Sequence, residues 1–158
     1  MAKEFFGTGS SEVRADKPMT EREVVVAILR HPTEARYLCV HNRKFDWIDF
    51  VMGGIEGTET PVEAGQREVR EETGYTDLGE LKEWSEVCYD NFYAAHKEVN
   101  RHITIHTIYG QLQSLAREER SAEEAEIADV LWVPAEELAE KLTQQAHRYL
   151  WEEIQKLN

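Results

Sequence analysis

The stretch from Gly53 to Tyr75 constrains the fold most, because it sets both ends of one helix. Thr60 can cap the helix, Pro61 suits its first position, and Glu63 completes a capping-box pattern with Thr60. Gly74 supplies the stop, since glycine readily adopts the left-handed conformation that ends many helices. The sequence therefore predicts a helix that begins at Pro61 and ends before Gly74.

Three carboxylates share one face of this predicted helix, because Glu68, Glu71 and Glu72 are spaced i, i+3 and i+4. Like charges packed this closely repel each other. A divalent cation would remove the repulsion, since hard cations bind carboxylate oxygens. The spacing therefore indicates a metal-dependent enzyme. The alternative is a solvated charged face with pairs such as Glu63 to Arg67.

A second face of the helix is suited to packing on a sheet. Gly65 on that face lowers helix propensity by about 1 kcal/mol relative to alanine, and a close approach to the sheet would explain it. At roughly 100° per residue, the residues that share this face are Val62, Gly65, Gln66, Val69 and Thr73.

Apolar and β-branched runs elsewhere in the chain predict a sheet covered by a few helices, which is a mixed α+β fold. Residues 1–20 look like a loose N-terminal arm, and residues 21–158 form a single domain. Residues 90–100 are expected to be a loop. The predicted strands cover residues 23–29, 36–41, 47–52, 81–89, 101–112 and 130–133, and further helices begin at Pro134 and near Gln144. The apolar side of the last helix is predicted to hold Tyr149, Leu150, Ile154 and Leu157, while Trp47 and Trp132 are assigned to the core.

The net charge of −13 argues against a partner that needs a basic surface, so neither long nucleic acid nor a membrane is expected. A phosphorylated small molecule would need cations to screen it from so acidic a protein. Cys39 and Cys88 lie in apolar, strand-like surroundings and are predicted to be reduced core thiols. No stretch approaches the ~18 apolar residues of a spanning helix, so we expect a cytoplasmic protein.

The motif residues together resemble the signature of the Nudix hydrolases. That signature is Gly, five residues, Glu, seven residues, then Arg-Glu-apolar-any-Glu-Glu-any-Gly-apolar. The corresponding positions in this chain are Gly53, Glu59, Arg67, Glu68, Val69, Glu71, Glu72, Gly74 and Tyr75.

The resemblance implies an α/β/α sandwich and a pyrophosphohydrolase that cleaves a nucleoside diphosphate linked to another group. It implies Mg²⁺ or Mn²⁺ as cofactor, with Glu68, Glu71 and Glu72 as metal ligands. Glu68 would also act as base towards the attacking water. Arg67 and Glu59 would be an orienting pair in the catalytic site. Homodimers are frequent among similar proteins.

Two positions depart from the family pattern. Val51-Met52 stands where the family commonly has Pro-Gly, in a loop whose backbone carbonyl often helps to bind metal. Tyr75 ends the signature where an aliphatic residue is usual. Neither departure replaces a carboxylate.

A narrower likeness connects three segments with a Nudix-like module of some bacterial leucyl-tRNA synthetases. The segments are residues 12–40, 50–64 and 92–102, although the chain shows no nucleotide-binding signature of a synthetase. This likeness gives a further hypothesis. The protein would be a partner or relative of the tRNA-charging system and would act on an aminoacyl-adenylate or a modified nucleotide. The alternative to an enzyme is a catalytically silent module that binds a nucleotide or interacts with another protein.

Residues outside the signature supply further candidates. The loop with Tyr93, His96, Asn100 and Arg101 has aromatic and polar groups suited to stacking a base and holding phosphate, although a structural use fits equally well. The family often takes one more metal ligand from outside the signature. Glu98, Glu123, Glu124 and Glu126 are the candidates here, and we expect each to be solvated.

Overall fold

The centre of the sheet is a long parallel pair, β2 (Met19–Arg30) with β8 (Val99–Gln111), hydrogen-bonded from Met19 with Asn100 to Arg30 with Gln111. The computed structural model describes residues 2–157. Within these residues nine strands form one mixed sheet in the order β1-β7-β8-β2-β3-β4, with β5 on β2, β6 on β8 and β9 on β3. The other strands are β1 (Glu4–Phe6), β3 (Arg36–Asn42), β4 (Trp47–Asp49), β5 (Val51–Gly54), β6 (Leu81–Glu83), β7 (Cys88–Ala94) and β9 (Ala128–Pro134).

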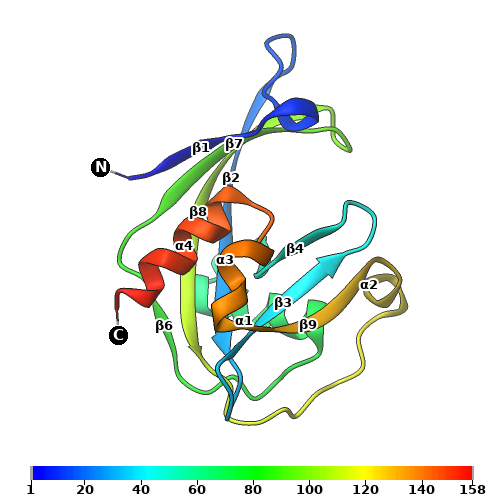
Figure 1. Cartoon of the computed structure of the whole chain (residues 1–158). Coiled ribbons are helices and arrows are strands. Elements are labelled where there is room, and N and C mark those ends of the chain that lie inside the picture. Colours follow the sequence, from blue (N-terminus) through cyan, green and yellow to red (C-terminus); the bar gives the residue numbers. More distant parts are fainter. Residues whose placement is uncertain (1, 158) are drawn as a thin grey trace.

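Helices cover both faces of this sheet (Figure 1). Alternate residues of β2 point to opposite faces, as a strand requires. Val25, Ala27 and Leu29 pack in one core with α1 (Pro61–Thr73), whereas Val24, Val26 and Ile28 pack in the other. The second core is covered by α3 (Leu138–Lys141) and α4 (Gln145–Gln155). The predicted α/β/α sandwich is therefore confirmed.

Helix α1 begins and ends as its sequence predicts. The Thr60 hydroxyl accepts a hydrogen bond from the Glu63 N–H, and the Glu63 carboxylate accepts one from the Thr60 N–H. Gly74 ends the helix in the left-handed conformation with a φ of 86°. The capping box thus fixes where the following carboxylates point.

The face of α1 that packs on the sheet differs slightly from the prediction. Gly65, Val69 and Thr73 are buried as predicted, but Gln66 is exposed and Ala64 is buried in its place. A Cβ at Gly65 would clash with the Ile108 Cδ1 on β8, so the absence of a side chain lets the helix approach the sheet closely.

Several strand limits differ from the prediction because strand pairing extends or interrupts them. The region 81–89 is two strands, β6 and β7, and β7 continues to Ala94 because β8 and β1 supply hydrogen-bond partners on its two sides. The predicted loop therefore shrinks to residues 95–98. Residues 47–52 are divided between β4 and β5. The segment expected to be a loose arm carries β1, which pairs in parallel with β7.

Two predictions about apolar side chains were wrong. Trp47 is 39% exposed and stacks on Phe45, because Phe45 lies in the β3–β4 turn and Trp47 directly follows that turn, away from the core. Leu157 is 48% exposed beyond the end of α4, and Trp151 is buried in the core that α4 covers.

Cys39 and Cys88 are buried free thiols, as predicted. In the part of the chain that the structure describes, the helices are too short or too polar to cross a membrane.

The close approach at Gly65 gives a first prediction. Gly65→Val should lower the free energy of unfolding by about 1–3 kcal/mol, because the added side chain meets Ile108 in a filled core. Urea unfolding measures this change. The matched control is Gln66→Val, which places the same side chain on the exposed neighbour and should change stability by less than about 0.5 kcal/mol. Equal effects of the two changes would contradict the packing argument.

The buried His147 of α4 gives a second prediction. Its Nδ1 accepts a hydrogen bond from the Phe50 N–H at 3.2 Å, while its Nε2 is buried without a partner. Burial lowers the pKa of His147, and the nearby Asp49 opposes this effect. The unfolded chain therefore takes up the proton first, and stability should fall as the pH drops below about 6.5.

Urea unfolding at pH values on either side of about 6.5 tests this expectation. His147→Gln, which cannot be protonated, should show a shallower loss of stability in acid. His96→Gln, at an exposed histidine, should keep the wild-type slope. An unchanged slope in His147→Gln would show that other groups cause the acid sensitivity.

Candidate active site

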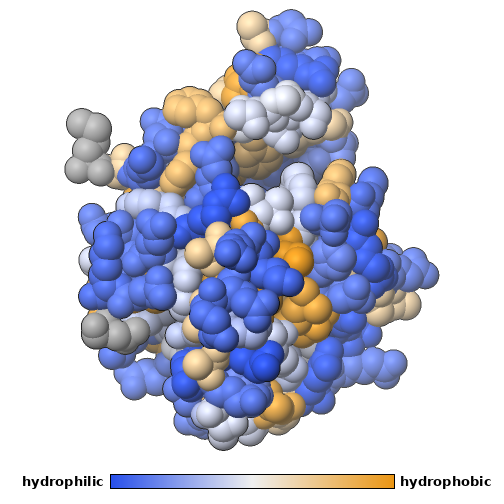
Figure 2. All heavy atoms as spheres, viewed as in Figure 1, coloured by the Kyte–Doolittle hydropathy of each residue, from blue (hydrophilic) through white to orange (hydrophobic). Residues whose placement is uncertain are grey.

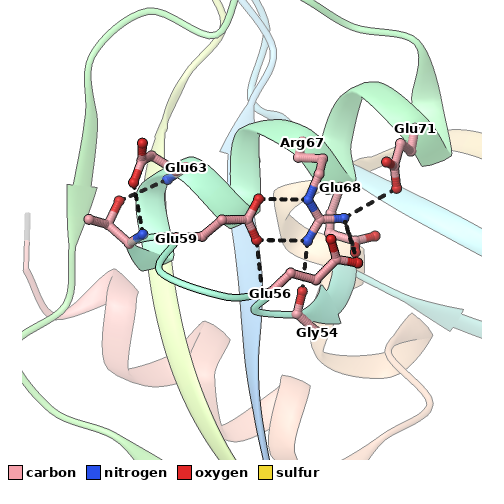
Figure 3. A network of polar contacts seen from close by, with 8 residues as sticks. Gly54, Glu56, Glu59, Glu63, Arg67, Glu68 and Glu71 are labelled. Carbon is pink, nitrogen blue, oxygen red and sulfur yellow. Dashed lines mark hydrogen bonds and ion pairs between the residues drawn. The ribbon is translucent and has the colours of Figure 1, made fainter.

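Arg67 lies at the centre of the polar network that joins α1 to the loop before it (Figure 3). Its Nε and Nη2 donate to the two carboxylate oxygens of Glu59 at 2.7 and 3.0 Å, which is a bidentate pair. Nη2 also donates to the Gly54 carbonyl at 2.8 Å, and Nη1 donates to the Glu68 carboxylate at 2.9 Å. One guanidinium thus holds the strand end, the loop and the helix together.

Electrostatics keeps this pair ionised. The hydrogen bond from Arg67 and the backbone hydrogen bond from Glu56 lower the pKa of Glu59 to about 2. The hydrogen bond from Glu59 raises the pKa of Arg67 above its already high ordinary value. Glu59 therefore stays ionised at ordinary pH, and its carboxylate holds Arg67 and the loop of residues 55–59 in place.

The glycine that opens the signature makes room for Glu68. A Cβ at Gly53 would clash with the Glu68 carboxylate, so any other residue there would push that carboxylate away from the strand. Val51 and Met52, where the family commonly has Pro-Gly, lie within β5 and pair with Ala27 and Val26 of β2. In this chain the segment before Gly53 is therefore regular strand.

Glu72 shows the clearest need for a cation. Its Oε2 is buried and has no hydrogen-bond partner. Burial raises the pKa of Glu72, and the carboxylates of Glu68, Glu124 and Glu71 raise it further. A divalent cation would satisfy the oxygen and reduce the repulsion, so this donor set of carboxylate oxygens fits Mg²⁺ or Mn²⁺.

The carboxylates are not yet arranged around a single point. Within residues 2–157 no three His, Cys, Asp or Glu side chains already have the arrangement of a metal site. Glu68 is hydrogen-bonded to Arg67, whereas the Glu71 side chain is 55% exposed and bonds Arg67 at 3.3 Å. Binding of a cation therefore requires side-chain rotation, for which Glu71 has the most freedom.

One carboxylate from outside the signature joins the cluster. Glu124, in α2 (Ala122–Ile127), is half-buried, and its pKa is raised by burial and by the charges of Glu68 and Glu71, with Arg120 opposing. We expected a solvated side chain, and Glu124 is instead only partly exposed. Ser121 with Glu124 has the spacing of a helix N-cap, and this pattern could have placed Glu124 on an ordered turn. The other candidates, Glu98, Glu123 and Glu126, are exposed.

Two arginines hold the ends of the segment that carries Glu124. Arg120 donates to the Ala128 carbonyl at 2.8 Å and to the Glu72 carbonyl at 3.5 Å. Arg43, from the β3–β4 turn, donates to the carbonyls of Ala125 and Glu126. The short helix is thus attached both to α1 and to the β3–β4 turn.

A cleft of about 920 Å³ lies beside the carboxylates. Its lining includes Arg67 and Glu71 of α1, Glu124 of α2 and the segment 75–79. At the base of that segment, the Tyr75 hydroxyl accepts a hydrogen bond from the Trp132 Nε1 at 3.0 Å. Tyr75 therefore keeps the packing role of the position and adds a polar contact.

The four residues of the predicted substrate loop lie in different surroundings. Asn100 is buried, and its side-chain amide hydrogen-bonds to the backbone of Arg14 and Lys17. Tyr93 is also buried, and the Arg14 guanidinium carbon lies 4.0 Å from the centre of the Tyr93 ring. These two side chains hold the N-terminal segment. His96 is exposed on the β7–β8 turn, and Arg101 is half-buried on β8. Substrate contact stays a prediction for all four residues.

Comparison with known proteins identifies the family of the chain. The NUDIX domain family matches residues 19–154. No curated protein sequence matches the chain.

Solved structures share the fold at low identity. The E. coli dihydroneopterin triphosphate pyrophosphohydrolase has a TM-score of 0.64 at 17% identity, over 87% of this chain and 97% of its own. The NUDIX domain of Shewanella oneidensis NrtR, in complex with ADP ribose, has a TM-score of 0.64 at 16% identity, over 87% and 88%. A C. elegans Ap4A hydrolase has a TM-score of 0.60 at 12% identity, over 86% and 96%.

The Arg67 network gives a third prediction. Arg67→Lys should loosen the loop 55–59, because an ammonium group cannot hold Glu59 in two places and reach the Gly54 carbonyl as well. Amide hydrogen exchange at Glu56, whose N–H donates to Glu59, should become at least about tenfold faster. Arg70→Lys, at an exposed arginine paired with Glu118, should leave this exchange unchanged. Unchanged exchange in Arg67→Lys would contradict the role of Arg67.

Proposed function

The chain belongs to the NUDIX family and is a Nudix hydrolase, and from this premise we propose that it cleaves, with a divalent metal, a nucleoside diphosphate linked to another group. The observation that carries the proposal is the buried, unpartnered oxygen of Glu72 among the carboxylates of Glu68, Glu71 and Glu124. These like charges repel one another and destabilise the protein when no cation is bound. It suits a site that binds a cation together with a phosphorylated substrate.

The roles of the side chains follow from their positions. Glu72, Glu68 and Glu71 would hold Mg²⁺ or Mn²⁺, with Glu124 as a further ligand from α2. The cation, when bound, neutralises phosphate oxygens and lowers the pKa of bound water. Glu68, which lies against the Gly53 backbone, is the residue that we assign as base towards the attacking water.

Arg67 and Glu59 act on the geometry of the reaction. Their bidentate pair holds the loop 55–59 against α1, and through Nη1 it also fixes one oxygen of Glu68. A base that is held in one orientation transfers a proton more efficiently than a mobile one. Glu59 stays ionised and bound to Arg67, so it is a positioning residue rather than a proton carrier.

The substrate class follows from the chemistry of the site. Water attack at a phosphorus of a pyrophosphate gives two phosphorylated products, and the cleft beside α1 leaves room for one of the linked groups. The solved structures with this fold include proteins named for different phosphorylated compounds, dihydroneopterin triphosphate and Ap4A, so the fold does not select among such substrates. Loops outside the signature must supply that selection.

Our fourth prediction concerns activity and its dependence on metal. Purified protein with Mg²⁺ or Mn²⁺ should cleave at least one member of a panel of dinucleotides, nucleotide sugars and nucleoside triphosphates between two phosphates. Chelation of the metal should abolish the cleavage, and Glu72→Gln should remove most of it. Separation of the products by chromatography measures each effect.

Two other outcomes would point elsewhere. Nucleotide binding by calorimetry without turnover, unaffected by Glu72→Gln, would indicate a silent binding module and overturn the proposal. Cleavage of an aminoacyl-adenylate alone, if that compound is added to the panel, would favour a role near tRNA charging.

Our fifth prediction isolates Glu124. Glu124→Gln should lower kcat/KM by about 10- to 100-fold, the range usual for loss of a supporting group at a metal site. Glu123→Gln is the matched control, since Glu123 lies on the same helix and is exposed. Both variants should unfold at the same temperature as wild type. Equal activities of the two variants would remove Glu124 from the site.

A further inference from the structure

Two arginines stand apart from the other basic residues. Within residues 2–157, Arg22 and Arg101 are the arginines whose guanidinium groups make no hydrogen bond, ion pair or aromatic stacking contact. The other arginines, which each have such a contact, are Arg14, Arg30, Arg36, Arg43, Arg67, Arg70, Arg117, Arg120 and Arg148. In a chain with 31 acidic and 18 basic residues, two arginines without an acidic partner need an explanation.

The strand register places these two arginines side by side. On the parallel pair β2–β8, Arg22 lies opposite Ile103 and Arg101 lies opposite Thr20, so the two arginines are diagonal neighbours on one face. Further along the two strands this face packs under α3 and α4, since Ile103 and Val24 belong to the core there. Arg22 itself is exposed and Arg101 is half-buried. Figure 2 shows this side of the molecule, whose surface is largely hydrophilic.

The arginines affect each other electrostatically. Burial lowers the pKa of Arg101, and the charge of Arg22 lowers it further. Two like charges held together raise the free energy of the protein unless an anion joins them. Asp90, opposite Ile103 on β7, is the nearest acidic residue by register on the face that the two arginines share, but it forms no ion pair with either of them. Burial raises the pKa of Asp90, and the hydrogen bond that it accepts from the Asn91 N–H opposes this effect.

Arg22 is connected with the catalytic signature through Gly54. A Cβ at Gly54 would clash with the Arg22 guanidinium, just as a Cβ at Gly53 would clash with the Glu68 carboxylate. Successive strand residues face opposite ways, so the arginine and the carboxylate lie on the two faces of the same strand end. Since neighbouring Cα atoms are about 3.8 Å apart, the Glu68 carboxyl carbon and the nearest Arg22 nitrogen lie within roughly 11 Å of each other.

We propose that Arg22 and Arg101 together form an anion subsite that binds a phosphate group of the substrate, across β5 from the catalytic carboxylates. Guanidinium groups bind phosphate through paired N–H donors, and the absence of side chains at Gly53 and Gly54 lets the carboxylate and the guanidinium both lie against this strand end. The inference rests on the proposed function and deepens it. The substrate carries one phosphate at the carboxylates and a second anionic group at the arginines, as a pyrophosphate-containing nucleotide does.

Binding without metal tests this subsite apart from catalysis. Inorganic pyrophosphate is titrated calorimetrically into the full chain in the presence of a chelator, so that the carboxylates cannot contribute through a cation. Wild type should bind pyrophosphate, and Arg22→Gln and Arg101→Gln should each weaken binding at least about tenfold, the loss usual for one charge-assisted contact. Arg36→Gln, a control at a strand arginine that bonds the Trp132 carbonyl, should bind like wild type.

The outcomes separate this inference from the proposed function. Wild-type binding in Arg22→Gln and Arg101→Gln, or no binding by wild type at millimolar pyrophosphate, would overturn the subsite even if the nucleotide panel is cleaved. Weakened binding in both variants, with unchanged thermal unfolding, would support the subsite even if no panel member is cleaved. Where a substrate is found, the two variants should raise KM more than they lower kcat.

Discussion

The bidentate contact between Arg67 and Glu59 is the interaction on which the rest of the site depends. It joins residues eight positions apart, one in a loop and one in a helix, and the same guanidinium reaches the Gly54 carbonyl and the Glu68 carboxylate. Because the hydrogen bond from Arg67 lowers the pKa of Glu59 to about 2, this connection does not vary with ordinary changes of pH. The Glu68 carboxylate is therefore oriented by a pair of side chains whose charges stay constant over the ordinary pH range.

Missing side chains matter as much as charged ones in this fold. Gly65 lets α1 lie close to β8, Gly53 lets Glu68 lie against the strand, and Gly54 accommodates the Arg22 guanidinium. Each glycine thus brings a charged or apolar group to the backbone at a distance that a Cβ would forbid. The short segment Gly53–Gly54 thus has the Glu68 carboxylate on one side and the Arg22 guanidinium on the other.

Features that depend on neighbouring residues along the chain could be predicted from the sequence. Contacts between segments that are distant in the sequence could not. The capping box of α1, its stop at Gly74 and the role of Gly65 were all readable from local pattern. The approach of Glu124 to Glu68 was not, because it depends on how loop 113–121 folds over α1. Asn100 likewise binds the backbone of Arg14, 86 residues away, and no local pattern contains that contact. Trp47 was wrongly assigned to the core because the residue type alone does not distinguish an aromatic side chain beside a turn from one in a core.

The attachment of α2 has a consequence for how chains of this kind diversify. Glu124 belongs to a six-residue helix with no buried residues, which is tied to the rest of the protein by the hydrogen bonds of Arg120 and Arg43 to backbone carbonyls. Backbone carbonyls are present whatever the side chains are. Mutation can therefore rewrite the sequence of this helix, and with it the outer carboxylate, while both anchoring arginines keep their acceptors. The carboxylates of α1 lie on a helix with buried residues that fix it on the sheet, whereas Glu124 lies on a helix without such residues.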